Sequence, residues 1–212
     1  MKNTIMKYCL VPFSIFVFLN MPSIVPDPAY GQDRIKGPSS ISREEIPDWQ
    51  ARWELAKVLS YVKRYDESIA EYNKLLKEKP TLYEARVETA NILFWQGKNA
   101  EALKTLEQIP ATDITGNTLV LMADLYVIRK QYEKAETLYG EYLAKHPNEH
   151  KVRLKLAQTL NWDKKYDQSL AEYRTILQAL PDDIQIRRKY AFVLIWSGKH
   201  AEAAAELKKT LR

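Results

Sequence analysis

The most regular feature of the chain is an apolar pattern that recurs about every 34 residues. Three segments align at sight: LFWQGKNAEAL at 93–103, LNWDKKYDQSL at 160–170 and LIWSGKHAEAA at 194–204. Two weaker copies begin at Leu59 and Leu125. A small residue just before each copy shows the register best, with spacings of 34, 33, 34 and 34: Ala56, Ala90, Ala123, Ala157 and Ala191. Self-similarity at such a period indicates stacked structural repeats.

Other positions keep the same register. A second small residue follows the first by 12 positions: Ser68, Ala102, Ala135, Ser169 and Ala203. Between them stand Tyr65, Tyr132 and Tyr166, replaced in the other two copies by Asn99 and His200. A later aromatic appears in three copies, as Tyr72, Tyr139 and Tyr173. The same three copies close on a proline, at Pro80, Pro147 and Pro181.

This pattern resembles the tetratricopeptide repeat, a pair of antiparallel helices. The resemblance covers residues 49–212 and implies an all-α fold, a right-handed α-solenoid of about five helix-turn-helix repeats. The repeats would span about 49–82, 83–115, 116–149, 150–183 and 184–212. First helices are expected near 49–63, 82–96, 117–129, 149–163 and 183–197. Second helices are expected near 65–78, 99–109, 132–145, 166–179 and 200–211.

The physical chemistry of the pattern is simple. Small residues let the paired helices approach closely, and tyrosines and leucines fill the space between hairpins. Gly97 and Gly198 are expected to end first helices, and the closing prolines to end second helices. Four polar residues are expected as N-caps: Asp48, Thr81, Asn148 and Asp182.

Two copies depart from the pattern. Pro110 shortens the second helix of copy two and opens a polar linking loop at 110–117. The last helix either caps the array itself or presents an apolar stripe to a partner or a second copy, through Ala204, Leu207 and Leu211.

The N-terminus is typical of an export signal. Lys2 and Lys7 precede a 12-residue, largely apolar run at 8–19, and small residues lie before a cleavage point after Gly31. We therefore expect a signal peptide at 1–31, a flexible linker at 32–48 and a periplasmic or secreted protein. The alternative is a membrane anchor that stays uncleaved, although the run is shorter than the roughly 20 residues that span a bilayer.

Composition narrows the functional classes. One cysteine among 212 residues excludes a disulfide framework and a multi-cysteine zinc site, and Cys9 lies in the predicted signal. The net charge of +5 is uneven. Residues 49–148 hold 14 basic and 14 acidic side chains, whereas 149–212 hold 13 and 8. Nucleic acid is disfavoured as a partner by the export signal.

The resemblance implies that first helices line a concave groove. The predicted partner-binding residues are Trp53, Lys57, Tyr61, Asn91, Trp95, Asp124, Gln158, Trp162, Arg188 and Trp196. One column of equivalent positions is nearly all aromatic: Tyr61, Trp95, Ile128, Trp162 and Trp196. These rings would be either contact surfaces for a ligand or core between hairpins. The carboxylate clamp of some chaperone-binding members is incomplete, with only Asn91 matching.

Basic residues cluster in the last two copies. The predicted basic patch is Lys151, Arg153, Lys155, Arg187, Arg188 and Lys189. It would favour an acidic protein, an anionic polysaccharide or phospholipid headgroups. The alternative is an ordinary solvated helix face.

No catalytic or cofactor motif is present in the sequence. His146 and His150 have a metal-binding spacing, but Pro147 breaks the helix between them, so no metal or cofactor is expected. We expect a non-enzymatic scaffold that binds a protein partner in the cell envelope. The alternative is a protein associated with exopolysaccharide or its export machinery, because copies of the form L-x-W-x-G-K resemble repeats in such systems.

Overall fold

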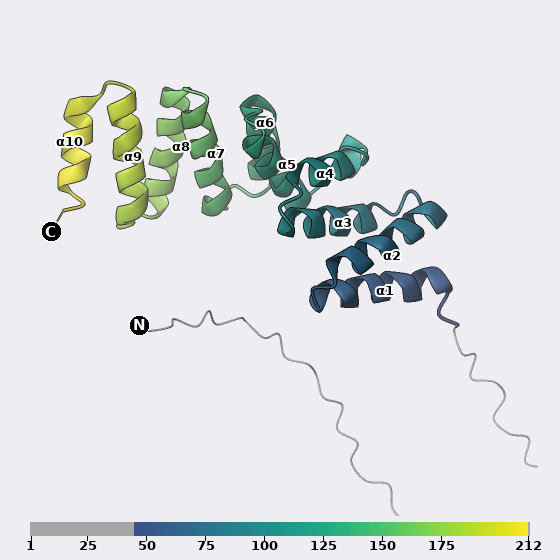
Figure 1. The fold of residues 1–212 in the computed structure, drawn as a ribbon. Helices are drawn as coiled ribbons and strands as arrows, with labels where there is room; N and C mark the ends of the chain where they lie inside the picture. Colours follow the sequence, from purple (N-terminus) through teal and green to yellow (C-terminus); the bar gives the residue numbers. More distant parts are fainter. Residues whose placement is uncertain (1–44, 212) are drawn as a thin grey trace, which may run out of the picture. The chain divides into compact units, whose positions relative to one another are not determined.

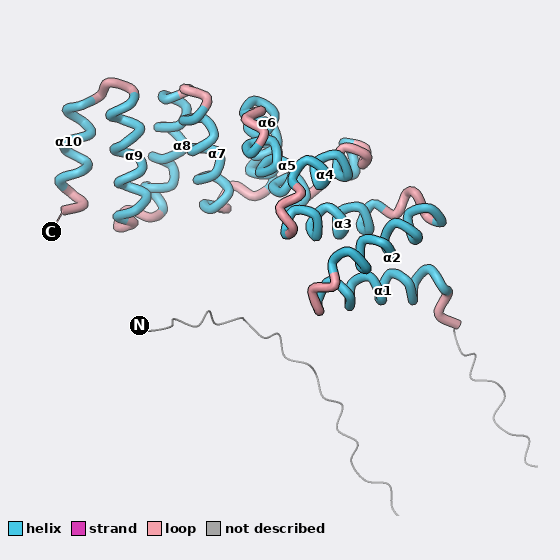
Figure 2. Tube along the Cα trace, in the orientation of Figure 1, coloured by secondary structure: helices cyan, strands magenta, loops and turns pink. Residues whose placement is uncertain are grey.

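The computed structural model describes residues 45–211, which belong to one compact unit. This part of the chain is all-helical, with no strand among the described residues (Figure 2). The predicted signal peptide and most of the predicted linker lie outside these residues. None of the described helices is long and apolar enough to cross a membrane.

Ten helices follow one another as five hairpins (Figure 1). The first helices of the hairpins are α1 (Asp48–Tyr61), α3 (Tyr83–Trp95), α5 (Asn117–Ile128), α7 (His150–Trp162) and α9 (Ile184–Trp196). The second helices are α2 (Tyr65–Glu78), α4 (Asn99–Leu106), α6 (Tyr132–Lys145), α8 (Tyr166–Ala179) and α10 (His200–Lys208). Each helix packs mainly on its neighbours in sequence, within its hairpin and against the next. This is the predicted solenoid, and the predicted helix ranges are confirmed to within three residues.

The repeated small residues lie where the two helices of a hairpin meet. All five alanines of the first-helix column are fully buried, and so are their small partners on the second helices. In two hairpins the partner is a serine that bonds back to the first helix. Ser68 Oγ donates to the Ala56 carbonyl at 2.6 Å, and Ser169 Oγ donates to the Ala157 carbonyl at 2.7 Å. The small size of these residues is what allows the close approach.

The core lies between helices along the whole array, in three clusters of buried side chains. Tyr72, Tyr139 and Tyr173 are almost completely buried in it, as predicted. Burial raises the pKa of all three tyrosines, and for Tyr173 it raises the pKa to about 12. The neutral phenol is therefore the form that the core stabilises.

The helix ends confirm that the predicted glycines and prolines end helices, but the predicted N-cap residues are wrong. Asp48 is the first residue of α1 rather than its N-cap, because Pro47 occupies the cap position, and no side-chain cap hydrogen bond forms there. Thr81, Asn148 and Asp182 lie one residue too early, since Leu82, Glu149 and Asp183 occupy the cap positions. Asp183 is the one cap whose side chain bonds in the described helices, accepting from the Ile186 amide at 2.9 Å.

The predicted shortening in copy two is also confirmed. Helix α4 has 8 residues, whereas α2, α6 and α8 have 14. A single 3-10 turn at Ala111–Asp113 follows in the loop. Ile109 and Ile114 from this loop are buried, and they fill part of the space that the missing helical turns leave.

Five left-handed residues end the first helices. Gly97 and Gly198 have φ values of 75° and 79°, and Lys63, Lys130 and Lys164 adopt the same conformation with φ between 57° and 62°. In each case the next amide donates to a carbonyl five residues earlier, as in Lys165 N to Leu160 O at 2.8 Å. This is the helix-ending geometry that favours glycine.

The lysines at this position should carry a measurable cost. Replacing Lys164 with glycine removes the steric strain of a left-handed side chain, so we expect the free energy of unfolding to rise by up to about 1 kcal/mol. Gly198→Ala should lower it by a similar amount. Urea unfolding followed by circular dichroism measures both. A loss of stability in Lys164→Gly would contradict the argument.

The buried tyrosines predict alkaline instability. The pKa of Tyr173 in the folded protein is above its ordinary value. The free energy of unfolding that its neutral form contributes is therefore complete below pH 10 and is lost as the pH rises through 12. Between pH 10 and pH 12 the free energy of unfolding of Tyr173→Phe should fall by about 2 to 3 kcal/mol less than that of the wild type. Tyr61→Phe is the control, because Tyr61 is 76% exposed. Identical pH profiles for wild type and Tyr173→Phe would refute the assignment.

Candidate functional site

The aromatic column lies outside the buried core. Its five members are the last residues of the five first helices. Their exposed fractions are 76%, 59%, 49%, 51% and 55% for Tyr61, Trp95, Ile128, Trp162 and Trp196. Half or more of nearly every one of these large side chains is therefore accessible to a ligand.

Two indole rings rest against tyrosines of the preceding hairpin. The ring centroids of Trp95 and Tyr65 are 6.4 Å apart, and those of Trp162 and Tyr132 are also 6.4 Å apart. Each tyrosine begins the second helix of its hairpin. The contact with tyrosine restrains each indole on one side, and the other side stays exposed as a contact surface.

Ion pairs also join consecutive hairpins, through lysines that follow the column positions in the chain. Lys165 Nζ lies 2.7 Å from Glu136 of the preceding hairpin, and Lys199 Nζ lies 2.7 Å from Asp167. The hydrogen bond from Lys199 lowers the pKa of Asp167, and the Gln96 amide together with Lys98 does the same for Asp66. Exposed pairs of this kind contribute little to stability, but they link the first hairpin to the second, the third to the fourth and the fourth to the fifth.

The basic patch is largely tied up in internal pairs. Arg153 lies 2.5 Å from Glu172 and donates to the Pro147 carbonyl, and Arg187 repeats this arrangement with Glu206 and Pro181. A similar pair, Arg52 with Glu71, occurs in the first hairpin. These arginines therefore join the two helices of a hairpin.

The other patch residues divide into two groups. Arg188 donates to the Thr210 carbonyl at 3.0 Å, and Lys155 lies 2.5 Å from Asp124. Lys151 and Lys189 are exposed, and within residues 45–211 neither has a carboxylate within 4.0 Å. Of these two, Lys189 also lines a pocket.

Asp124, a predicted binding residue, connects two hairpins. Its Oδ1 accepts from the Tyr139 hydroxyl at 2.5 Å, and its Oδ2 lies 2.5 Å from Lys155 Nζ. Burial, and then the bond to Asp124, raise the pKa of Tyr139. Both carboxylate oxygens are thus engaged inside the protein.

The first two hairpins place their predicted residues differently. Lys57 pairs with Glu54 at 2.6 Å and lies 5.5 Å from the ring centroid of Trp53. Trp53 is half-buried beside Trp49, with ring centroids 6.4 Å apart. Asn91 is half-buried on α3.

The last two hairpins bring several predicted residues together in a pocket. It lies between α7 and α9 and has a side chain of α8 in its lining. The lining residues are Gln158, Asn161, Trp162, Tyr173, Lys189, Phe192, Val193 and Trp196. Phe192 and Trp196 stack with centroids 6.1 Å apart, and Phe192 is 50% exposed.

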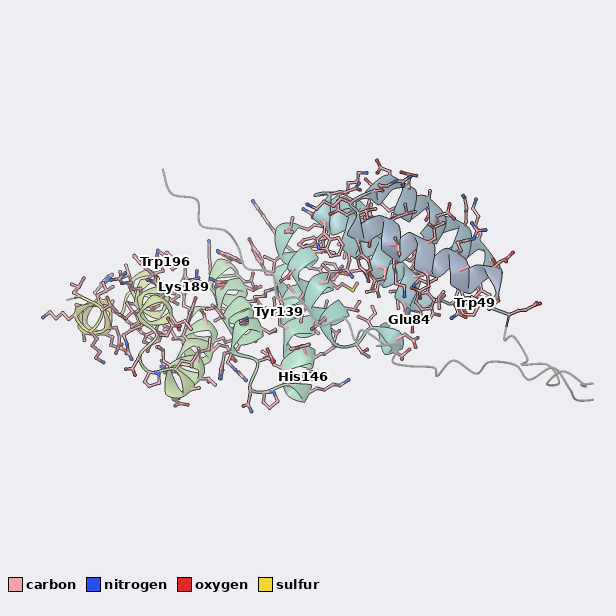
Figure 3. The ribbon with its side chains drawn as sticks, turned by 90° about the horizontal axis from the view of Figure 1, so that it is seen from below. Trp49, Glu84, Tyr139, His146, Lys189 and Trp196 are labelled. Atoms are coloured by element: carbon pink, nitrogen blue, oxygen red, sulfur yellow. The ribbon has the colours of Figure 1, made fainter. Side chains whose placement is uncertain are left out.

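Figure 3 places two of these residues in space. Lys189 and Trp196 lie close together at one edge of the array, and His146 lies at the opposite edge (Figure 3). Sequence reasoning missed Tyr173 as a lining residue, because its buried ring is explained by packing alone. It also assigned Lys189 to a broad patch rather than to an aromatic pocket.

His146 and His150 flank a turn, as expected. His146 caps the end of α6, and His150 is the first residue of α7. No group of three or more potential metal-ligating side chains gathers within residues 45–211.

Known structures share this architecture. The crystal structure of MamA is 16% identical, with a TM-score of 0.70, over 77% of this chain and 90% of that one. YrrB, described as a TPR protein with an unusual peptide-binding site, is also 16% identical, with a TM-score of 0.70, over 77% and 84%. At these identities the likeness shows the fold alone.

A curated protein matches part of the chain. ER membrane protein complex subunit 2 of Xenopus tropicalis is 31% identical over 93 residues, which is 42% of this chain. The match spans only 30% of that relative's length. The family pattern described as tetratricopeptide repeat matches residues 62–113 and 126–188, more than half of the chain. The repeat register, the five helical hairpins and this match agree, and the chain belongs to the tetratricopeptide repeat family.

Proposed function

We propose that the protein is a non-catalytic scaffold that binds a peptide segment of a partner protein along the ends of its first helices. The tetratricopeptide fold is one that supports protein–protein interaction. The observation that carries the proposal is the exposure of the aromatic column. Rigid, half-exposed tryptophans are the side chains that most often dominate protein interfaces.

The packing of these rings supports the same function. Soluble proteins rarely leave several large aromatic side chains half exposed in one row unless the surface is used. The indoles of Trp95 and Trp162 are already held against tyrosines, so a ligand would not have to order them. Pre-ordered contact surfaces reduce the entropic cost of binding.

Association with exopolysaccharide or its export machinery is a second candidate. The same exposed rings favour it, since flat aromatic faces can stack on sugar rings. The polar groups of the pocket between α7 and α9 could bond to hydroxyls. A protein segment is preferred because Lys189, which has no carboxylate within 4.0 Å among the described residues, and the rings beside it suit a mixed apolar and acidic ligand.

The place of action belongs to the same proposal. The positively charged, apolar and small-residue segments of 1–31 support export to the periplasm or beyond. The partner would then be a component of the cell envelope.

A photo-crosslinker tests the binding surface. With benzoylphenylalanine in place of Trp162, we expect crosslinks in intact cells to one reproducible protein. The control carries the probe at Gln178, which is exposed on the second helix α8. Crosslinks should be several-fold weaker there. Equal yields from both positions would rule out the first-helix ends as the binding surface.

Mass spectrometry tests export. We expect the protein recovered from the envelope or medium to lack residues 1–31 and to begin at Gln32. Such a protein contains no cysteine, so thiol labelling should fail under denaturing conditions. Recovery of the full mass with Cys9 labelled would favour the membrane-anchored alternative.

A further inference from the structure

Equivalent positions at the four junctions between hairpins carry different charges. Each junction has one position on the earlier first helix, one on the earlier second helix and one on the later first helix. From the first junction to the fourth the sets are Lys57, Tyr72 and Glu88; Asn91, Leu106 and Leu121; Asp124, Tyr139 and Lys155; and Gln158, Tyr173 and Lys189. The first set holds one charge of each sign, and the second holds none.

The third junction shows how this arrangement binds a carboxylate. Asp124 lies between the Tyr139 hydroxyl and Lys155 Nζ, with 2.5 Å to each. One oxygen accepts from the phenol and the other from the ammonium group. Hydrogen bonds between charged partners are stronger than neutral ones.

The fourth junction has the same phenol and the same ammonium group but no carboxylate. Gln158 replaces Asp124, so the position that supplies the negative charge is neutral. Within residues 45–211 no hydrogen bond involves the Tyr173 hydroxyl, and Lys189 has no carboxylate within 4.0 Å. All three residues line the pocket between α7 and α9.

The pocket also offers an amide oxygen without a partner among the described residues, and apolar walls. Asn161 Oδ1 is buried and has no hydrogen-bond partner among the described residues. Trp162, Phe192 and Trp196 are the exposed aromatic residues of the lining, each about half exposed. An unsatisfied buried acceptor costs free energy until a ligand donor reaches it.

We propose that the fourth junction is a binding site for the carboxylate of an acidic side chain in a partner's peptide segment. The ligand carboxylate takes the place that Asp124 fills at the third junction, bonded to the Tyr173 hydroxyl and Lys189. Apolar residues beside the acidic one pack on Trp162, Phe192 and Trp196, and a backbone amide of the segment donates to Asn161. The inference rests on the proposed function and names the chemistry of its ligand.

A peptide of defined sequence is the probe. Acetyl-Gly-Phe-Asp-Phe-Gly-amide is titrated into the full chain while tryptophan fluorescence is followed. We expect saturable binding that weakens at least tenfold when the aspartate of the peptide is replaced by asparagine. Equal binding of the two peptides, or no binding of either, overturns the carboxylate site.

Two substitutions test the site from the protein side. Lys189→Gln should weaken the aspartyl peptide at least tenfold, to the level of its asparagine analogue. Gln158→Asp should abolish binding, because it supplies an internal carboxylate to Tyr173 and Lys189. Its thermal stability should equal or exceed that of the wild type, which excludes unfolding as the cause. Unchanged binding in Gln158→Asp refutes the proposal.

The matched control is Lys151→Gln, which removes another exposed lysine without a carboxylate within 4.0 Å in the described residues. It should bind as the wild type does. An equal loss in this variant would indicate general charge attraction and would overturn the site.

Other carboxylate sources are separate arms of the experiment. Acetyl-Gly-Phe-Gly-Phe with a free C-terminus presents a main-chain carboxylate, and an oligogalacturonate presents a sugar acid. Tighter binding of either one than of the aspartyl peptide overturns the assignment to an acidic side chain. If the Trp162 crosslink persists in Gln158→Asp and Lys189→Gln, the scaffold function stands and the carboxylate site alone fails.

Discussion

The close approach of two helices at paired small residues is the interaction on which the structure depends. Ala157 and Ser169 illustrate it, because both are fully buried and the serine hydroxyl bonds to the alanine carbonyl. A larger residue at either position would separate the helices and displace the tyrosines that fill the junctions. The separation of the two helices in each hairpin follows from this contact, and the side chains that fill the junctions then separate one hairpin from the next.

The fold was largely predictable from the sequence because its determinants are local and repeated. The small-residue columns, Gly97, Gly198 and the closing prolines each act within one hairpin, so their spacing alone fixes the helix ranges. The N-caps were less predictable. Thr81 and Asn148 are good capping residues in isolation, but the turns after the prolines place Leu82 and Glu149 at the cap.

The candidate site was predictable only in part. The equivalent positions of the aromatic column were visible in the sequence, but their exposure depends on how consecutive hairpins stack. The basic patch shows the limit more clearly. Composition counts Arg153 and Arg187 as free positive charge, whereas the structure pairs each with a glutamate 19 residues later on the same hairpin. Side-chain reach across a hairpin is not written in local sequence.

The order of charges at the junctions has a consequence for assembly of the array. Lysine precedes glutamate at the first junction, and aspartate precedes lysine at the third. If hairpin 1 stacked on hairpin 4, Lys57 would meet Lys155, and if hairpin 3 stacked on hairpin 2, Asp124 would meet Glu88. Like charges brought together in a partly buried junction oppose such pairings. The charges at the first and third junctions therefore disfavour these two non-native stackings of hairpins.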